Sequence, residues 1–193
     1  MRAWLRLSDV LVLVAPAHVV ELDHQPTIPL EVVRIVQPND ERVTQLPAVR
    51  RRYAIECLER GDVAYFAMSE GSLVGWVWAT AVSHRDPSTR LPISLSPGQV
   101  YAYDGWVLAG HRRHGVFQEM FRVLFADQAE RPAVTAVVSY VLASNDAIRR
   151  ALVPFGYVEV QRARFLVVLV RYGIRLPFTT RPRTRGPMRW RSA

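Results

Sequence analysis

One stretch near the middle of the chain constrains the fold more strongly than any other. Val100–Ala109 has the composition of a β-strand, and Val116–Glu130 has apolar residues at helical spacing. Gly110–Gly115 joins them through a short polar link that begins and ends with glycine. The sequence therefore predicts a strand, a tight basic loop and a helix in direct succession.

The loop has the properties of an anion-binding site. Arg112, Arg113 and His114 add positive charge just before the predicted helix, and Gly115 lets a ligand approach the backbone closely. The first turn of a helix also offers unpaired N–H groups and a partial positive charge. A pyrophosphate fits these properties, and a plain strand-to-helix turn with solvated arginines is the alternative. The lysine and spacing of a P-loop are absent, as is the G-x-G-x-x-G fingerprint.

The remaining segments predict a mixed α/β fold of the α+β kind. Strands are expected at Glu31–Val36, Asp62–Ser69, Leu73–Ala81, Ala133–Val141 and Tyr157–Val170. Helices are expected over residues 41–60, split by Pro47, and at Ser144–Pro154, with Ser144 or Asn145 as the N-cap. Residues 83–99 contain several prolines and are expected to form a long irregular loop.

The N-terminal end differs from the middle of the chain. Residues 1–30 are expected to form an extension, within which Met1–Ala17 vaguely resembles a secretory signal. Asp9 interrupts the apolar run, so a first strand, or a start placed too far upstream, is favoured over a cleaved signal. The run is also far shorter than the roughly 20 residues that span a bilayer, and no transmembrane helix is expected.

Basic residues gather at the C-terminal end. Residues 176–193 are expected to form a disordered basic tail, with Arg181, Arg183, Arg185, Arg189 and Arg191. Without these arginines the net charge falls from +8 to about +3. All 25 basic residues are arginine, so no lysine is available as a nucleophile or Schiff-base former. The single cysteine, Cys57, excludes a disulfide within the chain and fits a cytoplasmic location.

The predicted loop, together with the strand before it, resembles the acetyl-CoA-binding motif of the GCN5-related N-acetyltransferase (GNAT) family. The family's loop has the form Q/R-x-x-G-x-G/A. Arg112, Gly115 and Phe117 fall on its defined positions. Phe117 departs from the small residue that is usual there, and a bulky side chain is expected to change how the loop packs.

A second segment resembles another motif of the same family, N-x-x-A-x-x-x-Y-x-x-x-G-F. Its positions are occupied by Asn145, Ile148, Leu152, Gly156 and Tyr157. Leu152 replaces the tyrosine that often protonates the departing thiolate. The two motifs follow each other in the family's order and at the expected distance, over a resemblance that covers roughly residues 31–170.

The resemblance implies a domain at residues 31–175 with a mixed, mostly antiparallel central sheet, flanked by helices and with two central strands splayed apart. It also implies acetyl-CoA as the co-substrate. The residues that would bind it are Arg112, Arg113, His114, Gly115, Val116 and Phe117 at the pyrophosphate, and Trp106, Val107 and Leu108 along the pantetheine arm. Asn145 is a further candidate for cofactor contact, with helix capping as its alternative role.

Asp104 is the candidate general base that takes a proton from the attacking amine, directly or through water. It falls where the family often carries an acid, and neighbouring aromatic residues favour a raised pKa for its carboxyl group through desolvation. A solvated or salt-bridged strand carboxylate is the alternative, and Glu31 and Glu70 are weaker candidates. The general acid is left open among Tyr140, Tyr157 and water.

Two further clusters have plainer interpretations. Arg50, Arg51 and Arg52 are expected on a solvated helix face, with binding of an acidic substrate as the alternative. His84, His111 and His114 lack the spacing of a ligand set, so no metal site is expected.

Three classes of function follow from these patterns. The first is an N-acetyltransferase that acts on a primary amine of a small-molecule acceptor. The second is a non-catalytic acyl-CoA-binding or interaction domain on the same fold. The third is binding to nucleic acid or an anionic membrane surface through the tail, although no specific nucleic-acid partner is expected. The sequence patterns favour no particular acceptor or oligomeric state, and a homodimer is one option.

Overall fold

The computed structural model describes residues 4–18, 20–22, 25–85, 92–169 and 175–176. The chain divides into two compact units. The larger is Pro16–Val138, and the smaller combines Met1–Ala15 with Ser139–Ala193.

The larger unit is built on a sheet with the strand order β8-β7-β4-β3-β2. These strands are β2 Glu31–Ile35, β3 Val63–Ser69, β4 Ser72–Thr80, β7 Gln99–Val107 and the first part of β8 Ala136–Leu142. Neighbours are antiparallel except β7 and β8, which are parallel. Among the described residues the parallel ladder pairs Gln99–Tyr101 with Ala136–Val138 and goes no further, although β7 continues to Val107. This short ladder is what the predicted splay of two central strands requires.

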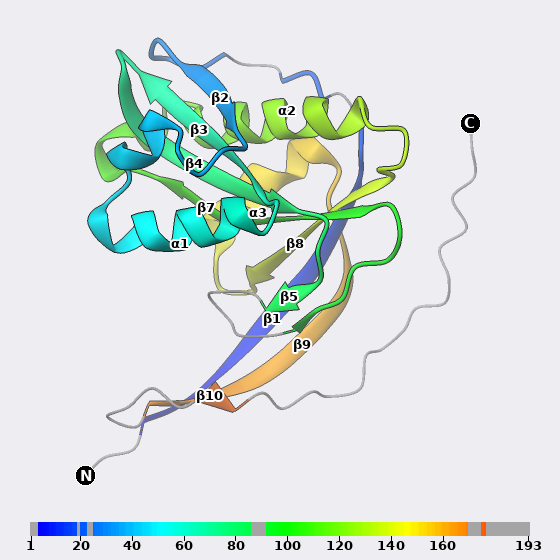
Figure 1. Cartoon of the computed structure of the whole chain (residues 1–193). Helices are drawn as coiled ribbons and strands as arrows, with labels where there is room; N and C mark the ends of the chain where they lie inside the picture. The colour runs from blue at the N-terminus through cyan, green and yellow to red at the C-terminus, as the bar shows by residue number, and fades with distance from the viewer. Residues whose placement is uncertain (1–3, 19, 23–24, 86–91, 170–174, 177–193) are drawn as a thin grey trace. The chain divides into compact units, whose positions relative to one another are not determined.

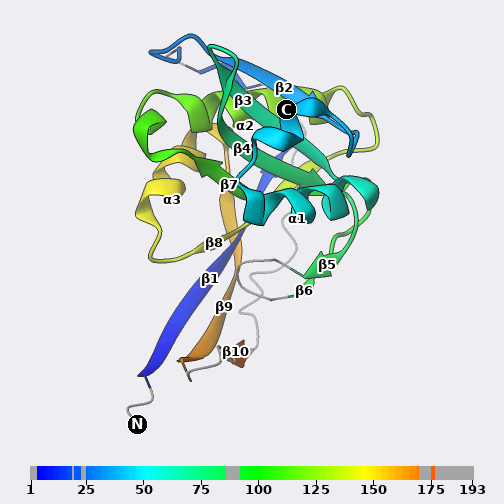
Figure 2. The ribbon, with the colours of Figure 1, turned by 60° about the vertical axis from the view of Figure 1, so that its left-hand side comes forward.

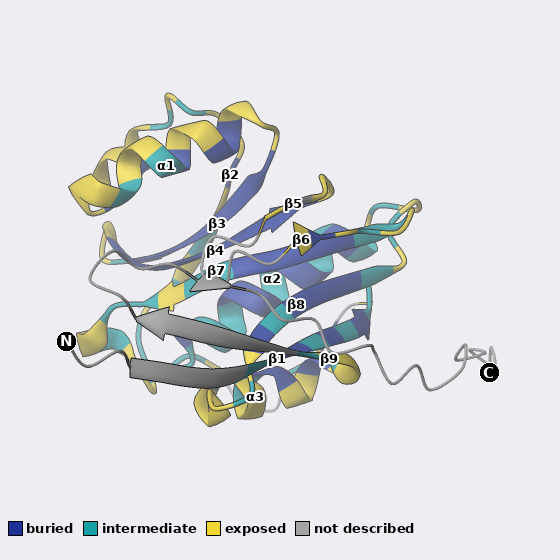
Figure 3. Cartoon of the chain, turned by 90° about the horizontal axis from the view of Figure 1, so that it is seen from below, coloured by how far each residue is buried: buried dark blue, intermediate teal, exposed yellow. Residues whose placement is uncertain are grey.

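Helices cover both faces of this sheet (Figure 1). The short 3-10 helix Glu41–Gln45 precedes α1 Ala48–Glu59, and Pro47 divides the two as the sequence predicts. Helix α2, Val116–Ala129, packs on β4, β3 and β7 with its apolar stripe. Strands β3 and β4 are buried along nearly their whole length (Figure 3), because each of their faces meets a helix.

The smaller unit has the strand order β10-β9-β1-β8. Its elements are β1 Trp4–Pro16, the end of β8, α3 Asp146–Leu152, the 3-10 helix Val153–Phe155, β9 Val158–Leu169 and β10 Arg175–Leu176. Strands β1 and β9 run antiparallel over most of their length (Figure 2). Burial alternates along Leu11–Ala15, the two-residue period of a strand with one covered face.

Together these elements confirm the predicted fold class, a mixed and mostly antiparallel sheet with three α-helices. Trp4–Pro16 is a strand paired with β9, which agrees with the first strand that was one of the two alternatives favoured for this segment. One detail differs from the sequence predictions. The loop at 83–99 contains a short ladder between β5 His84–Arg85 and β6 Pro92–Ile93.

Two predictions about the ends of the chain stay predictions. The basic tail from residue 177 onward lies outside the described residues, and the domain limits of 31–175 stay a prediction. Within the described part of the chain, no helix has the length and apolar character needed to cross a membrane.

Candidate functional site

The basic loop begins with a 3-10 turn, Ala109–His111, and ends at the left-handed Gly115, which has φ 79°. Arg113 is also left-handed, with φ 67°. The Arg112 guanidinium folds back over the end of β7, where its Nε donates to the carbonyl of Val107 at 3.1 Å. Its Cζ lies 5.3 Å from the ring centroid of Trp106, which is cation–π distance. Both arginines are exposed, and Arg112 is in addition anchored to β7.

The start of α2 leaves backbone donors available next to this charge. The first bond within the helix runs from Glu119 N to Gly115 O, at 3.0 Å. The N–H groups of Val116, Phe117 and Gln118 therefore have no acceptor inside the helix. An exposed arginine and a helix N-terminus at one place form the anion-binding arrangement that the sequence predicts.

A segment near the N-terminus packs directly against the loop. Thr27 N donates to the carbonyl of His114 at 3.2 Å, and the Thr27 hydroxyl lies 2.7 Å from His114 Nδ1. A Cβ on Gly115 would come within 3.1 Å of the Pro26 Cα. Glycine is thus required at residue 115 both by its left-handed φ and by the contact with Pro26, which occupies one side of the loop.

Phe117 is accommodated by a glycine on β7. Its ring stacks on Phe121, with the centroids 4.4 Å apart, and a Cβ on Gly105 would lie 3.2 Å from the Phe117 ring. The bulky residue at the usually small motif position therefore turns toward the sheet.

A β-bulge in β7 sets the direction of Asp104. Trp78 pairs with Tyr103 and Trp76 pairs with Trp106. Between these two pairs β7 has two residues and β4 has one, so β7 carries one extra residue. Asp104 takes a left-handed φ of 47°, and consecutive side chains of Tyr103 and Asp104 both reach α1. Bulges and strained residues of this kind cluster at functional sites, where they re-aim side chains.

Asp104 meets Arg50 of α1. Arg50 Nη1 lies 2.8 Å from one carboxylate oxygen and 3.1 Å from the other, and the Asp104 side chain is only 10% exposed. The salt-bridged state that the sequence left as an alternative is therefore the one observed. The solvated-face interpretation is wrong for Arg50, although it holds for Arg52, whose side chain is 92% exposed.

Some backbone groups of Trp106–Leu108 already form hydrogen bonds within the sheet. Leu108 N donates to Val74 O of β4 at 2.9 Å, so this donor is not available to a pantetheine arm. Backbone groups of successive strand residues point to opposite edges. Val107 therefore directs its N–H away from β4, and this group is the better candidate for the predicted role.

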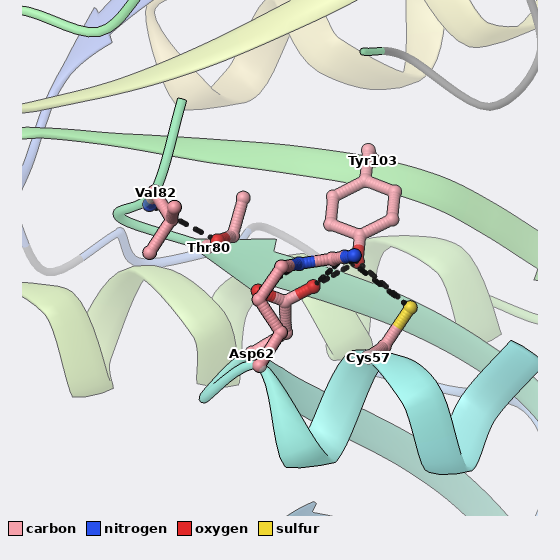
Figure 4. Close-up of polar contacts among 6 residues, drawn as sticks. Cys57, Asp62, Thr80, Val82 and Tyr103 are labelled. Carbon is pink, nitrogen blue, oxygen red and sulfur yellow. Dashed lines mark hydrogen bonds and ion pairs between the residues drawn. The ribbon is translucent and has the colours of Figure 1, made fainter. Parts of the chain in front are cut away.

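Next to Asp104 in the sequence, Tyr103 belongs to a polar cluster with the buried Cys57 and Asp62 (Figure 4) and with Arg60, which is more exposed. The Tyr103 hydroxyl donates to Asp62 at 2.5 Å and lies 3.4 Å from Cys57 Sγ. Arg60 forms an ion pair with Asp62, which is fully buried. Burial raises the pKa of the Tyr103 hydroxyl and of the Cys57 thiol above their ordinary values, so both stay protonated at neutral pH.

Cys57 is expected to be inert in the native protein. A buried thiol with a raised pKa forms little thiolate, which is the reactive species. A chromogenic disulfide reagent at pH 8 should therefore label it only after urea unfolds the chain, with Cys57→Ser as the blank. Full labelling of the native protein at the unfolded rate would contradict this packing.

The candidates in the smaller unit have local partners. Asn145 caps α3, its side-chain oxygen accepting from Ile148 N at 3.2 Å, so its cofactor contact stays a prediction. Leu152 is buried. The Tyr157 hydroxyl lies 3.1 Å from Ser139 Oγ, and burial raises its pKa.

The weaker candidate bases lie elsewhere on the larger unit. Glu31 and Glu70 line a pocket of about 470 Å³, together with Glu41 and Arg42. No residue of the Asp104–Arg50 pair lines this pocket, so the structure separates these glutamates from Asp104.

Sequence reasoning missed the polar face of α1. Arg50, Tyr53, Cys57 and Arg60 recur at spacings of three or four, which places them on one side of a helix. That spacing was visible in the sequence. Its partners on β7 were not, because they depend on the bulge.

No protein-family model matches the sequence, and no curated protein matches it. Solved structures do match the fold. An acetyltransferase structure assigned to the GNAT family, from Novosphingobium aromaticivorans, has a TM-score of 0.58 at 15% identity, over 86% of this chain and 66% of that one. A GNAT-family acetyltransferase from Colwellia psychrerythraea has a TM-score of 0.55 at 13% identity, over 86% and 57%.

A third structure includes part of the cofactor. AAC(6')-Iy, in complex with the bisubstrate analogue CoA-S-monomethyl-acetylneamine, has a TM-score of 0.52 at 15% identity, over 67% of this chain and 91% of that one. The chain spans about half to two thirds of the length of the first neighbours. These likenesses show that the chain has the fold of the GNAT acyltransferases.

Proposed function

We propose that the chain is an acetyl-CoA-dependent N-acetyltransferase that acts on a primary amine of a small molecule. The observation that carries the proposal is the succession of a bulged strand bearing Asp104, a basic loop, and a helix N-terminus. It occurs within a fold that acyl-CoA acyltransferases share. The loop supplies charge and backbone donors for a pyrophosphate, and the bulge supplies an acid, Asp104, three residues before Val107 on the same strand.

Different residues bind the cofactor, stabilise the oxyanion and accept the proton in this proposal. Arg112, Arg113 and the N–H groups of Val116 and Phe117 hold the phosphates, and the thioester supplies the acetyl group. The Val107 N–H is the candidate donor to the developing oxyanion. Asp104 holds the amine and accepts its proton, directly or through water.

A non-catalytic acyl-CoA-binding domain is the second candidate function. It is favoured by one observation, the occupation of both Asp104 oxygens by Arg50, which competes with an amine for this carboxylate. Leu152, buried where the family often has a tyrosine, is consistent with it.

A thermal-shift measurement tests both candidates. A ligand that binds the native state raises the apparent melting temperature by mass action. Acetyl-CoA at millimolar concentration is expected to raise it, whereas acetate at the same concentration is not. The absence of any shift contradicts both candidates. Release of CoA thiol with an amine panel then supports the enzyme, and binding without turnover on any amine supports the second candidate.

A further inference from the structure

We propose that Arg50 binds a carboxylate of the acceptor, so that the acceptor is a small amino acid carrying an amine and a carboxylate a few bonds apart. The inference rests on the proposed function and names the substrate class of the same site. Arg50 becomes a specificity-determining residue next to Asp104.

The geometry of the ion pair leaves Arg50 with capacity for a second partner. Both contacts to Asp104 use the single atom Nη1, at 2.8 and 3.1 Å. Within the described part of the chain, Arg50 Nε and Nη2 have no hydrogen-bond acceptor. The Arg50 side chain is 38% exposed, whereas that of Asp104 is 10% exposed. Arg50 is therefore the more exposed partner of the pair, and the Nε and Nη2 edge that Asp104 leaves open has the fork shape that binds carboxylates.

The two carboxylates in this part of the unit each have an arginine partner. Arg50 forms an ion pair with Asp104, and Arg60 forms one with Asp62. Burial raises the pKa of the Tyr53 and Tyr103 hydroxyls and of the Cys57 thiol, so these neighbours add no negative charge. An acceptor that brings only an ammonium group would therefore leave an excess positive charge beside Arg50.

An acceptor that brings its own carboxylate removes this excess. Its ammonium group lies on Asp104 and its carboxylate lies on the open edge of Arg50, so each charge has a partner of opposite sign. The short contacts between Arg50 and Asp104 require the two acceptor charges to be close, as they are in an α- or β-amino acid. Polyamines and other polycations fit poorly, because each added cation meets Arg50 without a counterion.

The test compares the protein amino acids with their carboxamides as acceptors, using the full chain, acetyl-CoA and CoA-thiol release. An amide keeps the amine but lacks the negative charge. For the best amino acid, kcat/KM should exceed that of its amide by about 10- to 100-fold, the range for a charged hydrogen bond. Arg50→Gln should bring this ratio close to one, and Arg50→Lys should keep part of it. Arg52→Gln is the matched control, since it removes an exposed charge from the same helix turn and should leave the ratio unchanged.

The outcomes separate this inference from the proposed function. No stabilisation by acetyl-CoA contradicts the proposed function and, with it, the inference. Turnover of amides equal to or above that of the acids contradicts the inference alone, as does a ratio that survives Arg50→Gln. Should Arg50→Gln fail to fold, the wild-type ratio and the Arg50→Lys ratio decide. A second readout is the melting temperature with CoA present, which the amino acid should raise more than its amide.

Discussion

Gly115→Glu is expected to weaken acetyl-CoA binding by about 100-fold. The new carboxylate would lie at the entrance of α2, where a like charge within a few ångströms of a phosphate costs several kcal/mol at an effective dielectric of about 20. It would also oppose the helix dipole that favours anions there. Titration calorimetry with acetyl-CoA on the folded variant measures this effect directly.

Gly115→Ala is the necessary control, because residue 115 has a second constraint. A Cβ at φ 79° costs about 1–2 kcal/mol for an L-residue, and this one also meets Pro26 at 3.1 Å. The alanine variant should therefore lose stability but keep most of its acetyl-CoA affinity. Equal affinities for the glutamate and alanine variants would mean that the phosphates bind elsewhere.

Asp104→Asn is expected to lower kcat by about 10²–10⁴-fold, the usual contribution of a general base. Asparagine tolerates the left-handed φ of 47° better than most residues and can still accept from Arg50, so the backbone should keep its bulge. Acetyl-CoA affinity should change little, because Asp104 lies on β7 rather than on the loop.

The control for this variant is Glu70→Gln, which removes one of the weaker candidate bases. Its kcat should stay within a factor of about two of wild type, since surface substitutions are usually near neutral. Near-normal turnover by Asp104→Asn, or a large loss in Glu70→Gln, would remove Asp104 from the mechanism.

The sequence predicts the local features of the fold well. The β-strand composition of β7, the helical stripe of α2 and the break at Pro47 are each determined by neighbouring residues. The same holds for the loop between β7 and α2, whose glycine and arginines lie next to one another in the chain.

What the sequence could not predict depends on distant partners. A first strand at Trp4–Pro16 was one of the sequence's own alternatives, but its partner Val158–Leu169, more than a hundred residues further along the chain, was not predicted. Pro26 and Thr27 reach the loop at Gly115 through contacts that no periodicity encodes. The same limit applies to Asp104, because only the register between β4 and β7 reveals the bulge that turns it toward Arg50.

The bulge also changes how the candidate site is understood. In the sequence, Asp104 is an acid on a strand among aromatic residues. In the structure, it is one half of an ion pair on the polar face of α1, next to Tyr103 on β7. The candidate site therefore combines an ion pair with its neighbours on β7 and α1, and the acceptor preference should reflect the open edge of Arg50.

The most direct test of the central claim is the transfer of a labelled acetyl group. Purified chain is incubated with trideuteroacetyl-CoA and a mixture of amino acids and amines, and the products are analysed by mass spectrometry. An N-acetyl product carrying the deuterium label is expected with the wild-type protein, and its formation should be strongly reduced with Asp104→Asn and Gly115→Glu. A labelled product formed at equal rates by all three proteins would contradict the central claim, as would the absence of any labelled product at saturating acetyl-CoA.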